Sequence, residues 1–254
     1  MTVFSNVTPT YSQSTQRRHS IDQMLALALI PLLLSAVSAV ERRANASRCD
    51  ISGATLSLPS NQTLLTAPSQ GPSYIGVAIG TQNYTCNATT GTYINVGAVA
   101  QLFDASCLYD SPEFSSLQEI AYTMWKYAPP TASISQVIEY LQPFHASFVL
   151  GQHYFVPSPS GPGVSPKWDF SSAALAGHPD AYVLAAKAGD IPAPTGPPNV
   201  DWLSLNKVEG NLATQVFRVN TVGGLPPASC TAGSPPIAVK YASTYWLYGS
   251  SVQQ

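Results

Sequence analysis

The segment from Gly210 to Gly249 constrains the fold most, because it contains two runs in which side chains alternate with the period of a β-strand. In the first run, the face predicted to be the core is Gln215, Phe217 and Val219, and the other face is Val216, Arg218 and Asn220. The second run alternates in the same way from Val239 to Tyr248 and is rich in β-branched and aromatic residues. Glycines and prolines between the runs forbid a helix or a central strand. We therefore expect a returning pair of strands joined by a surface loop, which Cys230 can tie down.

The N-terminal region indicates export from the cell. From Met24 the sequence is apolar and ends in Val37-Ser38-Ala39, small residues of the kind that a signal peptidase reads. A membrane anchor is the alternative, but roughly sixteen apolar residues interrupted by Pro31 are short for a bilayer span. We predict a signal peptide with a possible short pro-segment at 1–43, followed by a single secreted β domain at 44–254. No membrane span is expected after the signal is removed.

Charge and composition limit the partners of this domain. Charged residues make up only 9% of the chain, so hydroxyls, amides or attached sugars must keep the surface soluble. Residues 44–254 contain seven basic and eleven acidic residues, a net charge of about −4, with no basic patch for nucleic acid. Four sequons for N-glycosylation are present, at Asn45, Asn61, Asn83 and Asn87. These features are typical of an extracellular or cell-wall protein, whose oligomeric state the sequence leaves open.

The four cysteines all follow the signal segment, and an even number in an oxidising compartment predicts two disulfides. Three pairings are possible, and we favour Cys49 with Cys107 and Cys86 with Cys230. Metal binding is the alternative, but no CxxC or HxxxH spacing supports it, so no metal site is expected.

The remaining elements follow from periodicity. If Asn83 or Asn87 carries a glycan, Tyr84 must face the core, and Val77 and Ile79 would then be exposed unless both faces are covered or Gly80 marks a bulge. We favour the bulge. A helix beginning at Ser111 and a second at 134–141 form a helical insertion at 111–141. Residues 173–201 are expected to be mostly loop, with a short helix possible at 181–188. The predicted fold is mainly β, an antiparallel β-sandwich or distorted barrel with this small helical insertion.

Seven motifs occur in order between Leu58 and Gly249: GTQNYTC, AVAQLFDASC, GQHYFVP, PKWDF, VDWLSL, FRVNTVGGLPPASC and KYASTYWLYG. Together they resemble a fungal and bacterial family of secreted domains of unknown function, whose fungal members often carry an automatic malate dehydrogenase label. A nicotinamide enzyme needs a strand, a GxGxxG turn and a helix, whereas the single GxG here, at Gly161, lies in a Ser/Pro loop. We therefore expect no cofactor and regard the dehydrogenase as the least favoured reading.

Two functional hypotheses remain from the side chains. In the first, the protein binds a cell-wall glycan or an extracellular protein without catalysis, and Trp168, Tyr154 and Trp246 offer stacking surfaces for sugar rings. In the second, it is an extracellular hydrolase in which His153 is a general base oriented by Asp169 or Asp104. The structural alternative for His153 is a half-buried histidine hydrogen-bonded to the sheet. Exposure of the aromatic rings and the surroundings of His153 distinguish these hypotheses.

Overall fold

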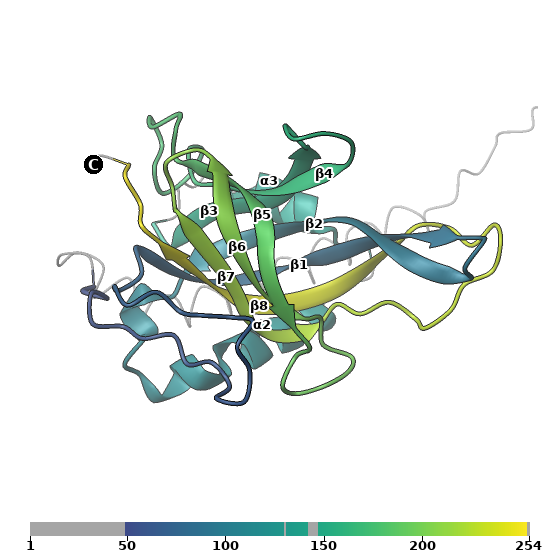
Figure 1. The fold of residues 1–254 in the computed structure, drawn as a ribbon, viewed down its shortest axis with the longest axis horizontal. Coiled ribbons are helices and arrows are strands. Elements are labelled where there is room, and N and C mark those ends of the chain that lie inside the picture. Colours follow the sequence, from purple (N-terminus) through teal and green to yellow (C-terminus); the bar gives the residue numbers. More distant parts are fainter. Residues whose placement is uncertain (1–48, 130, 142–146, 253–254) are drawn as a thin grey trace, which may run out of the picture.

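The computed structural model of this protein describes residues 49–129, 131–141 and 147–252. Within these residues, eight β-strands form a closed barrel in which each strand pairs antiparallel with the next along the chain (Figure 1). The strands are β1 (Tyr74–Asn87), β2 (Thr92–Asp104), β3 (Val149–Pro157), β4 (Val164–Asp169), β5 (Tyr182–Ile191), β6 (Trp202–Glu209), β7 (Gln215–Gly223) and β8 (Ile237–Tyr248). The predicted mainly β, antiparallel fold with a small helical insertion is confirmed, and of the two architectures it is the barrel.

The barrel closes between its first and last strands. Residues Tyr74 to Tyr84 of β1 pair in continuous register with Leu247 to Ile237 of β8. Each of the eight strands then has two hydrogen-bonded neighbours, although β2 pairs with β3 only from Ala100 to Phe103 and β4 pairs with β5 only from Lys167 to Asp169. The two runs that dominate the C-terminal sequence are adjacent strands, β7 and β8, as expected.

The barrel interior is lined by inward-facing side chains from all eight strands and the turns beside them. Large rings such as Trp168, Tyr241 and Tyr245 are packed beside small residues such as Ala78 and Ala100. The interior of an eight-stranded barrel is narrow, with room for packed side chains and at most one small ligand, and alternation of large and small residues fits the side chains together.

Strand β7 is buried on both faces, whereas the alternation predicted one core face. Phe217 and Val219 are fully buried on the outer side, under an N-terminal segment that contributes Ile51 and Leu65. Val216 lies in the interior cluster, and Arg218, two residues on, is 9% exposed. The cover over the outer face comes from residues distant in sequence, and a strand's own pattern cannot show it.

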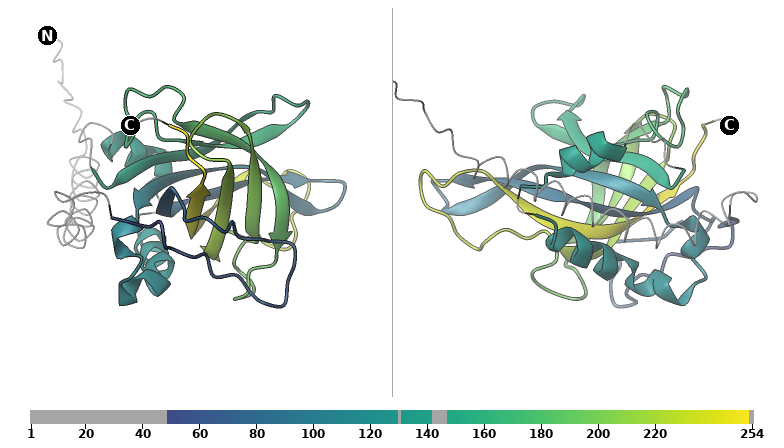
Figure 2. Two further views of the ribbon diagram at one scale, coloured as in Figure 1. Left: turned by 60° about the vertical axis from the view of Figure 1, so that its left-hand side comes forward. Right: turned by 180° about the vertical axis from the view of Figure 1, so that it is seen from behind.

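The helical insertion covers another part of the barrel wall (Figure 2). It begins with two 3-10 turns, η1 (Ser106–Leu108) and η2 (Pro112–Ser116), and continues as α2 (Leu117–Lys126) and α3 (Ile134–Leu141). The indole Nε1 of Trp125 donates a 2.7 Å hydrogen bond to the carbonyl oxygen of Gly80 in β1. None of the helices within the described residues has both the length and the apolar character that a membrane span needs.

The prediction of a bulge at Gly80 was wrong, and the alternative, that both faces of the strand are covered, holds instead. The register of β1 against β2 shifts three residues later, where Asn83 pairs with Gly97 and Tyr84 with Asn95. Ile79 is buried because it packs in the cluster of Trp125 and Ile134, so both faces of β1 are covered there. Gly80 has another role: a Cβ at this position would lie 2.3 Å from the carbonyl oxygen of Val99.

Both disulfides form with the favoured pairing. Cys49–Cys107 joins the N-terminal segment to η1, and Cys86–Cys230 joins the end of β1 to the loop between β7 and β8. The four cysteines therefore do not bind a metal as thiolates. The predicted signal segment and Asn45 lie outside the described residues.

Residues 182–188 of the stretch 181–188, considered for a short helix, instead belong to β5. Val183 and Ala185 point into the interior cluster, and the strand pairs with both β4 and β6. Ala185 fits the narrow interior, whereas Ala186 and Ala188 are exposed, and pairing with two neighbouring strands overrides the local preference of these alanines for a helix.

Candidate functional site

Strands β3 and β4 carry the residues on which the functional hypotheses depend, and their register decides which side each one faces. His153 is opposite Trp168, while Tyr154 is opposite Lys167. Trp168 belongs to the interior cluster. Since successive residues of a strand face opposite sides, His153 points into the barrel, and Tyr154, Lys167 and Asp169 lie on its outer face.

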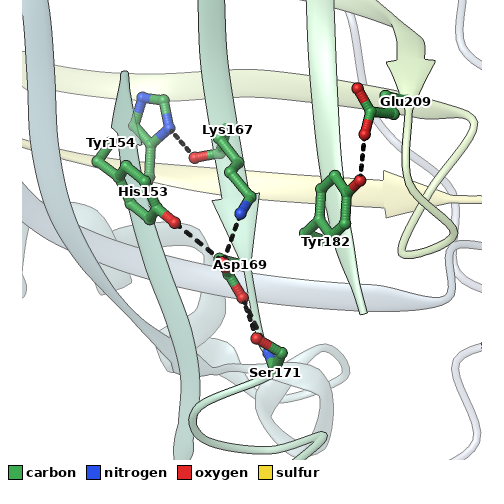
Figure 3. Close-up of polar contacts among 7 residues, drawn as sticks. All are labelled: His153, Tyr154, Lys167, Asp169, Ser171, Tyr182 and Glu209. Atoms are coloured by element: carbon green, nitrogen blue, oxygen red, sulfur yellow. Dashed lines mark hydrogen bonds and ion pairs between the residues drawn. The ribbon is translucent and has the colours of Figure 1, made fainter. Parts of the chain in front are cut away.

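His153 is a buried structural histidine. It is 2% exposed, and its ring stacks on that of Trp168 with centroids 4.3 Å apart. Nδ1 lies 3.0 Å from the carbonyl oxygen of Lys167, an acceptor, so Nδ1 carries the proton of a neutral imidazole (Figure 3). Burial lowers the pKa of His153 to about 3; the hydrogen bond to Lys167 opposes this shift, and the positive charge of Arg218 adds to it. At neutral pH the ring is uncharged.

Asp169 is the centre of a hydrogen-bonded network on the outer face. Its carboxylate forms an ion pair with Nζ of Lys167 at 2.8 Å. It also accepts hydrogen bonds from the hydroxyl of Tyr154 at 2.9 Å and from Oγ of Ser171 at 2.6 Å (Figure 3). Partial burial works to raise the pKa of Asp169, but hydrogen bonds from Lys167, Ser171 and Tyr154 outweigh it and hold the pKa below its usual range. The carboxylate is therefore ionised at neutral pH, and donors from three residues, Lys167, Tyr154 and Ser171, fix its orientation.

The same lysine connects this network to the next strand. Nζ of Lys167 lies 4.3 Å from the ring centroid of Tyr182 and 5.5 Å from that of Tyr154. The hydroxyl of Tyr182 donates to the carboxylate of Glu209, which raises the pKa of that hydroxyl. We call these five residues, Tyr154, Lys167, Asp169, Tyr182 and Glu209, the outer patch. Its members range from partly buried to exposed; Glu209 is exposed, and the Lys167 and Asp169 side chains are 20% and 14% exposed.

The structure does not bring the predicted acid/base pair together. His153 and Asp169 lie on opposite faces of the barrel wall, and His153 bonds to a backbone carbonyl instead. Asp104 accepts a hydrogen bond from the backbone N–H of Ser106 and so stabilises the turn into η1. Among the described residues, no group of three or more His, Cys, Asp or Glu side chains could hold a metal ion.

Of the three aromatic residues predicted to bind sugar, one reaches the surface. Trp168 and Trp246 are each 2% exposed, Trp168 inside the barrel and Trp246 in the cluster under the N-terminal segment. Tyr154 is partly exposed in the outer patch. Sequence reasoning missed Tyr182 and Glu209, because only the pairing of β5 with its two neighbours places them beside Lys167.

Three sequons fall within the described residues. Asn61 is exposed in the N-terminal segment. Asn83 and Asn87 lie on β1 and are partly exposed, and Oδ1 of Asn83 accepts a hydrogen bond from Oγ1 of Thr81. Tyr84 is 6% exposed, which is the burial that the alternation predicted. Glycosylation at these asparagines stays a prediction.

A sequence model for the family described as "Protein of unknown function (DUF3455)" matches residues 67–249 of this chain. The chain belongs to the DUF3455 family. The resemblance to a domain family of unknown function is thus confirmed, and the match covers the whole barrel, from before β1 to the end of β8. No curated protein and no solved structure gives a significant match to this DUF3455 chain.

Proposed function

We propose that this protein is an extracellular, non-catalytic glycan-binding protein, and that the outer patch is its binding surface. Export is supported by the apolar leader with its small-residue end and by the two disulfides, since disulfides persist mainly in oxidising compartments. The observation that carries the proposal is the outer patch itself, in which two tyrosine rings, a lysine and two carboxylates are held together on one face.

The chemistry of the outer patch fits a polyhydroxylated ligand. Carboxylate oxygens accept from sugar hydroxyls, the lysine donates to them, and tyrosine rings pack against the apolar faces of sugars. Because the side chains are already fixed by hydrogen bonds to each other, little conformational entropy is lost when a ligand binds. The patch has two carboxylates and one ammonium group, so we expect neutral or amine-bearing polysaccharides to bind in preference to acidic ones.

The same geometry argues against the hydrolase hypothesis. Glycoside hydrolysis needs one carboxyl group that is protonated near neutral pH and a second that is ionised. Asp169 is held ionised by Lys167, and His153 is uncharged and faces the barrel interior. The pair proposed from the sequence therefore cannot transfer a proton to a shared substrate.

The dehydrogenase reading has no support in the topology. A nicotinamide site requires a parallel strand, a glycine-rich turn and a helix whose N-terminus faces the pyrophosphate. All strand pairs of the barrel are antiparallel, and Gly161 and Gly163 lie in the loop between β3 and β4.

Binding of the secreted, disulfide-bonded protein to an array of β-glucan, mannan and chitin oligosaccharides tests the proposal. Tyr182→Ala should weaken binding about tenfold or more, because it removes a ring and the partner of Glu209. Tyr182→Phe keeps the ring and should retain most of the affinity. Ile94→Ala, a substitution at a 48% exposed site on β2, is the matched control. Absence of binding by the wild type to every glycan, or equal binding by Tyr182→Ala, would refute the proposal.

A further inference from the structure

A second feature of the molecule lies inside the barrel and is separate from the outer patch. Arg218 is the single arginine that follows Arg48 in the sequence, and it lies on the inward face of β7. Its register partners are Leu203 of β6 and Tyr245 of β8, which both pack in the interior cluster. The residue is 9% exposed, so a permanently charged group is almost entirely removed from water.

The charge of Arg218 has no acidic partner in the described part of the chain. Nε and Nη2 both donate to one backbone carbonyl oxygen, that of Asp201, at 3.3 and 2.9 Å. The carboxylate of Asp201 forms no ion pair with it, and the two ion pairs of the described residues are Lys167–Asp169 and Lys187–Asp190. A buried cation is normally paired with an anion, because burying an unpaired charge is costly.

Several buried donors that face the same interior as Arg218 also lack acceptors. Nε2 of Gln82, Oγ of Ser243 and Nε1 of Trp168 make no hydrogen bond within the described residues, although the three side chains are at most 4% exposed. All three face inward: Gln82 and Ser243 share the inward faces of β1 and β8 with Ala78 and Tyr241, and Trp168 is in the interior cluster. A buried polar group without a partner is uncommon in a native protein and needs an explanation.

These groups converge on two tyrosines of β8. The hydroxyls of Tyr241 and Tyr245 are 3.1 Å apart, and the ring of Tyr245 contacts those of Trp168 and His153 at 5.5 and 5.7 Å. Burial raises the pKa of Tyr241 well above its usual value and the neighbouring Tyr245 raises it further, whereas the charge of Arg218 lowers it. Arg218 therefore lies close enough to Tyr241 for its charge to act on that hydroxyl.

We propose that the barrel interior around Arg218 binds a small organic carboxylate that carries further oxygen acceptors. The guanidinium group would pair with the carboxylate, for which its planar set of donors is suited. Gln82, Trp168 and Ser243 would donate to the remaining oxygens, and the stacked rings of Trp168 and His153 would pack against the carbon body. Eight-stranded barrels are of the size that holds one small ligand. This site goes beyond the proposed glycan binding and shares no residue with the outer patch.

Calorimetric titration of the disulfide-bonded protein with succinate, citrate and benzoate tests the site. Inorganic phosphate distinguishes a general anion site from a carboxylate site, and dimethyl succinate tests the need for charge. At least one carboxylate should bind the wild type, Arg218→Gln should weaken that binding about thirtyfold or more, and Ser243→Ala should weaken it several-fold. Lys207→Gln removes an exposed cation and should leave the affinity unchanged, as should Tyr182→Ala.

The outcomes separate the two proposals and the two anion classes. Failure of all three carboxylates to bind the wild type at about 10 mM would overturn the site, as would equal binding by a folded Arg218→Gln variant. Binding of phosphate alone would overturn the carboxylate assignment. If Arg218→Gln does not fold, the carboxylate affinities of the Ser243→Ala and Gln82→Leu variants test the site instead, because both variants keep the charge and remove one donor. Affinities equal to that of the wild type would then overturn the site. Glycan binding that persists without carboxylate binding would refute only this inference.

Discussion

Burial of His153 should make the stability of this protein strongly dependent on pH. The pKa of His153 is lowered to about 3 in the folded chain, against 6.5 for an exposed histidine. Between these two values the unfolded chain binds a proton that the folded chain does not. Stability from this residue is therefore complete above pH 6.5 and is lost as the pH falls toward 3.

The two pKa values give the size of the effect. Lowering the pH from 7 to 5 should reduce the free energy of unfolding by about 2 kcal/mol through His153 alone. At pH 4 the loss should be about 3 kcal/mol. The physical reason is that a protonated imidazole would have to remain against Trp168 and within the field of Arg218, where burial leaves no water to solvate it.

Urea unfolding of the wild type and of His153→Gln at pH 7 and pH 5 measures this effect. Both proteins lose some stability as carboxyl groups titrate, but the wild type should lose about 2 kcal/mol more than the variant. Trp168→Phe is the matched control, because it disturbs the same ring stack and leaves the histidine in place, so its dependence on pH should follow the wild type. Identical losses for the wild type and His153→Gln would show that the buried, neutral histidine is not the cause.

Three further predictions concern stability. Replacing both Cys86 and Cys230 by alanine should lower the free energy of unfolding by about 5 kcal/mol on the chain-entropy estimate, because that disulfide closes a loop of 144 residues; denaturant unfolding checks this, and a loss below about 1 kcal/mol would contradict it. Gly80→Ala should be destabilising by about 2 kcal/mol or more, since its Cβ would meet backbone atoms of β2, and a thermal melt equal to the wild type would refute the close approach. Lys240→Met should cost about 1 kcal/mol, because Nζ caps the end of α2 through the carbonyls of Trp125 and Ala128; unchanged amide exchange in α2 would count against this role.

Local patterns predicted much of the fold because they depend on interactions over a few residues. Alternation identified the final strands, and the proline-led start and apolar stripe identified the helical insertion. The favoured disulfide pairing was confirmed. The same patterns were wrong for residues 181–188, where pairing with β4 and β6 makes a strand of a segment whose alanines favour a helix.

The candidate sites depended on register, which local patterns do not specify. Strands β3 and β4 could pair in several registers, and the sequence does not show which one forms. In the observed register His153 is opposite Trp168, so Asp169 lies on the other face of the barrel wall. In the same way, the outer patch exists because β5 pairs with both β4 and β6. No feature of the sequence near Lys167 indicates Tyr182 or Glu209 as its neighbours.

The sequence by itself determined that two disulfides could form, that the chain is rich in β-strands and that it carries little charge, since these follow from residue types and short-range periodicity. Only the tertiary structure decided that the sheet closes on itself and that Arg218 faces inward. Closure depends on the pairing of β1 with β8, strands more than 150 residues apart. That pairing converts one arginine in an ordinary alternating strand into a buried charge that forms no ion pair with any residue the structure describes.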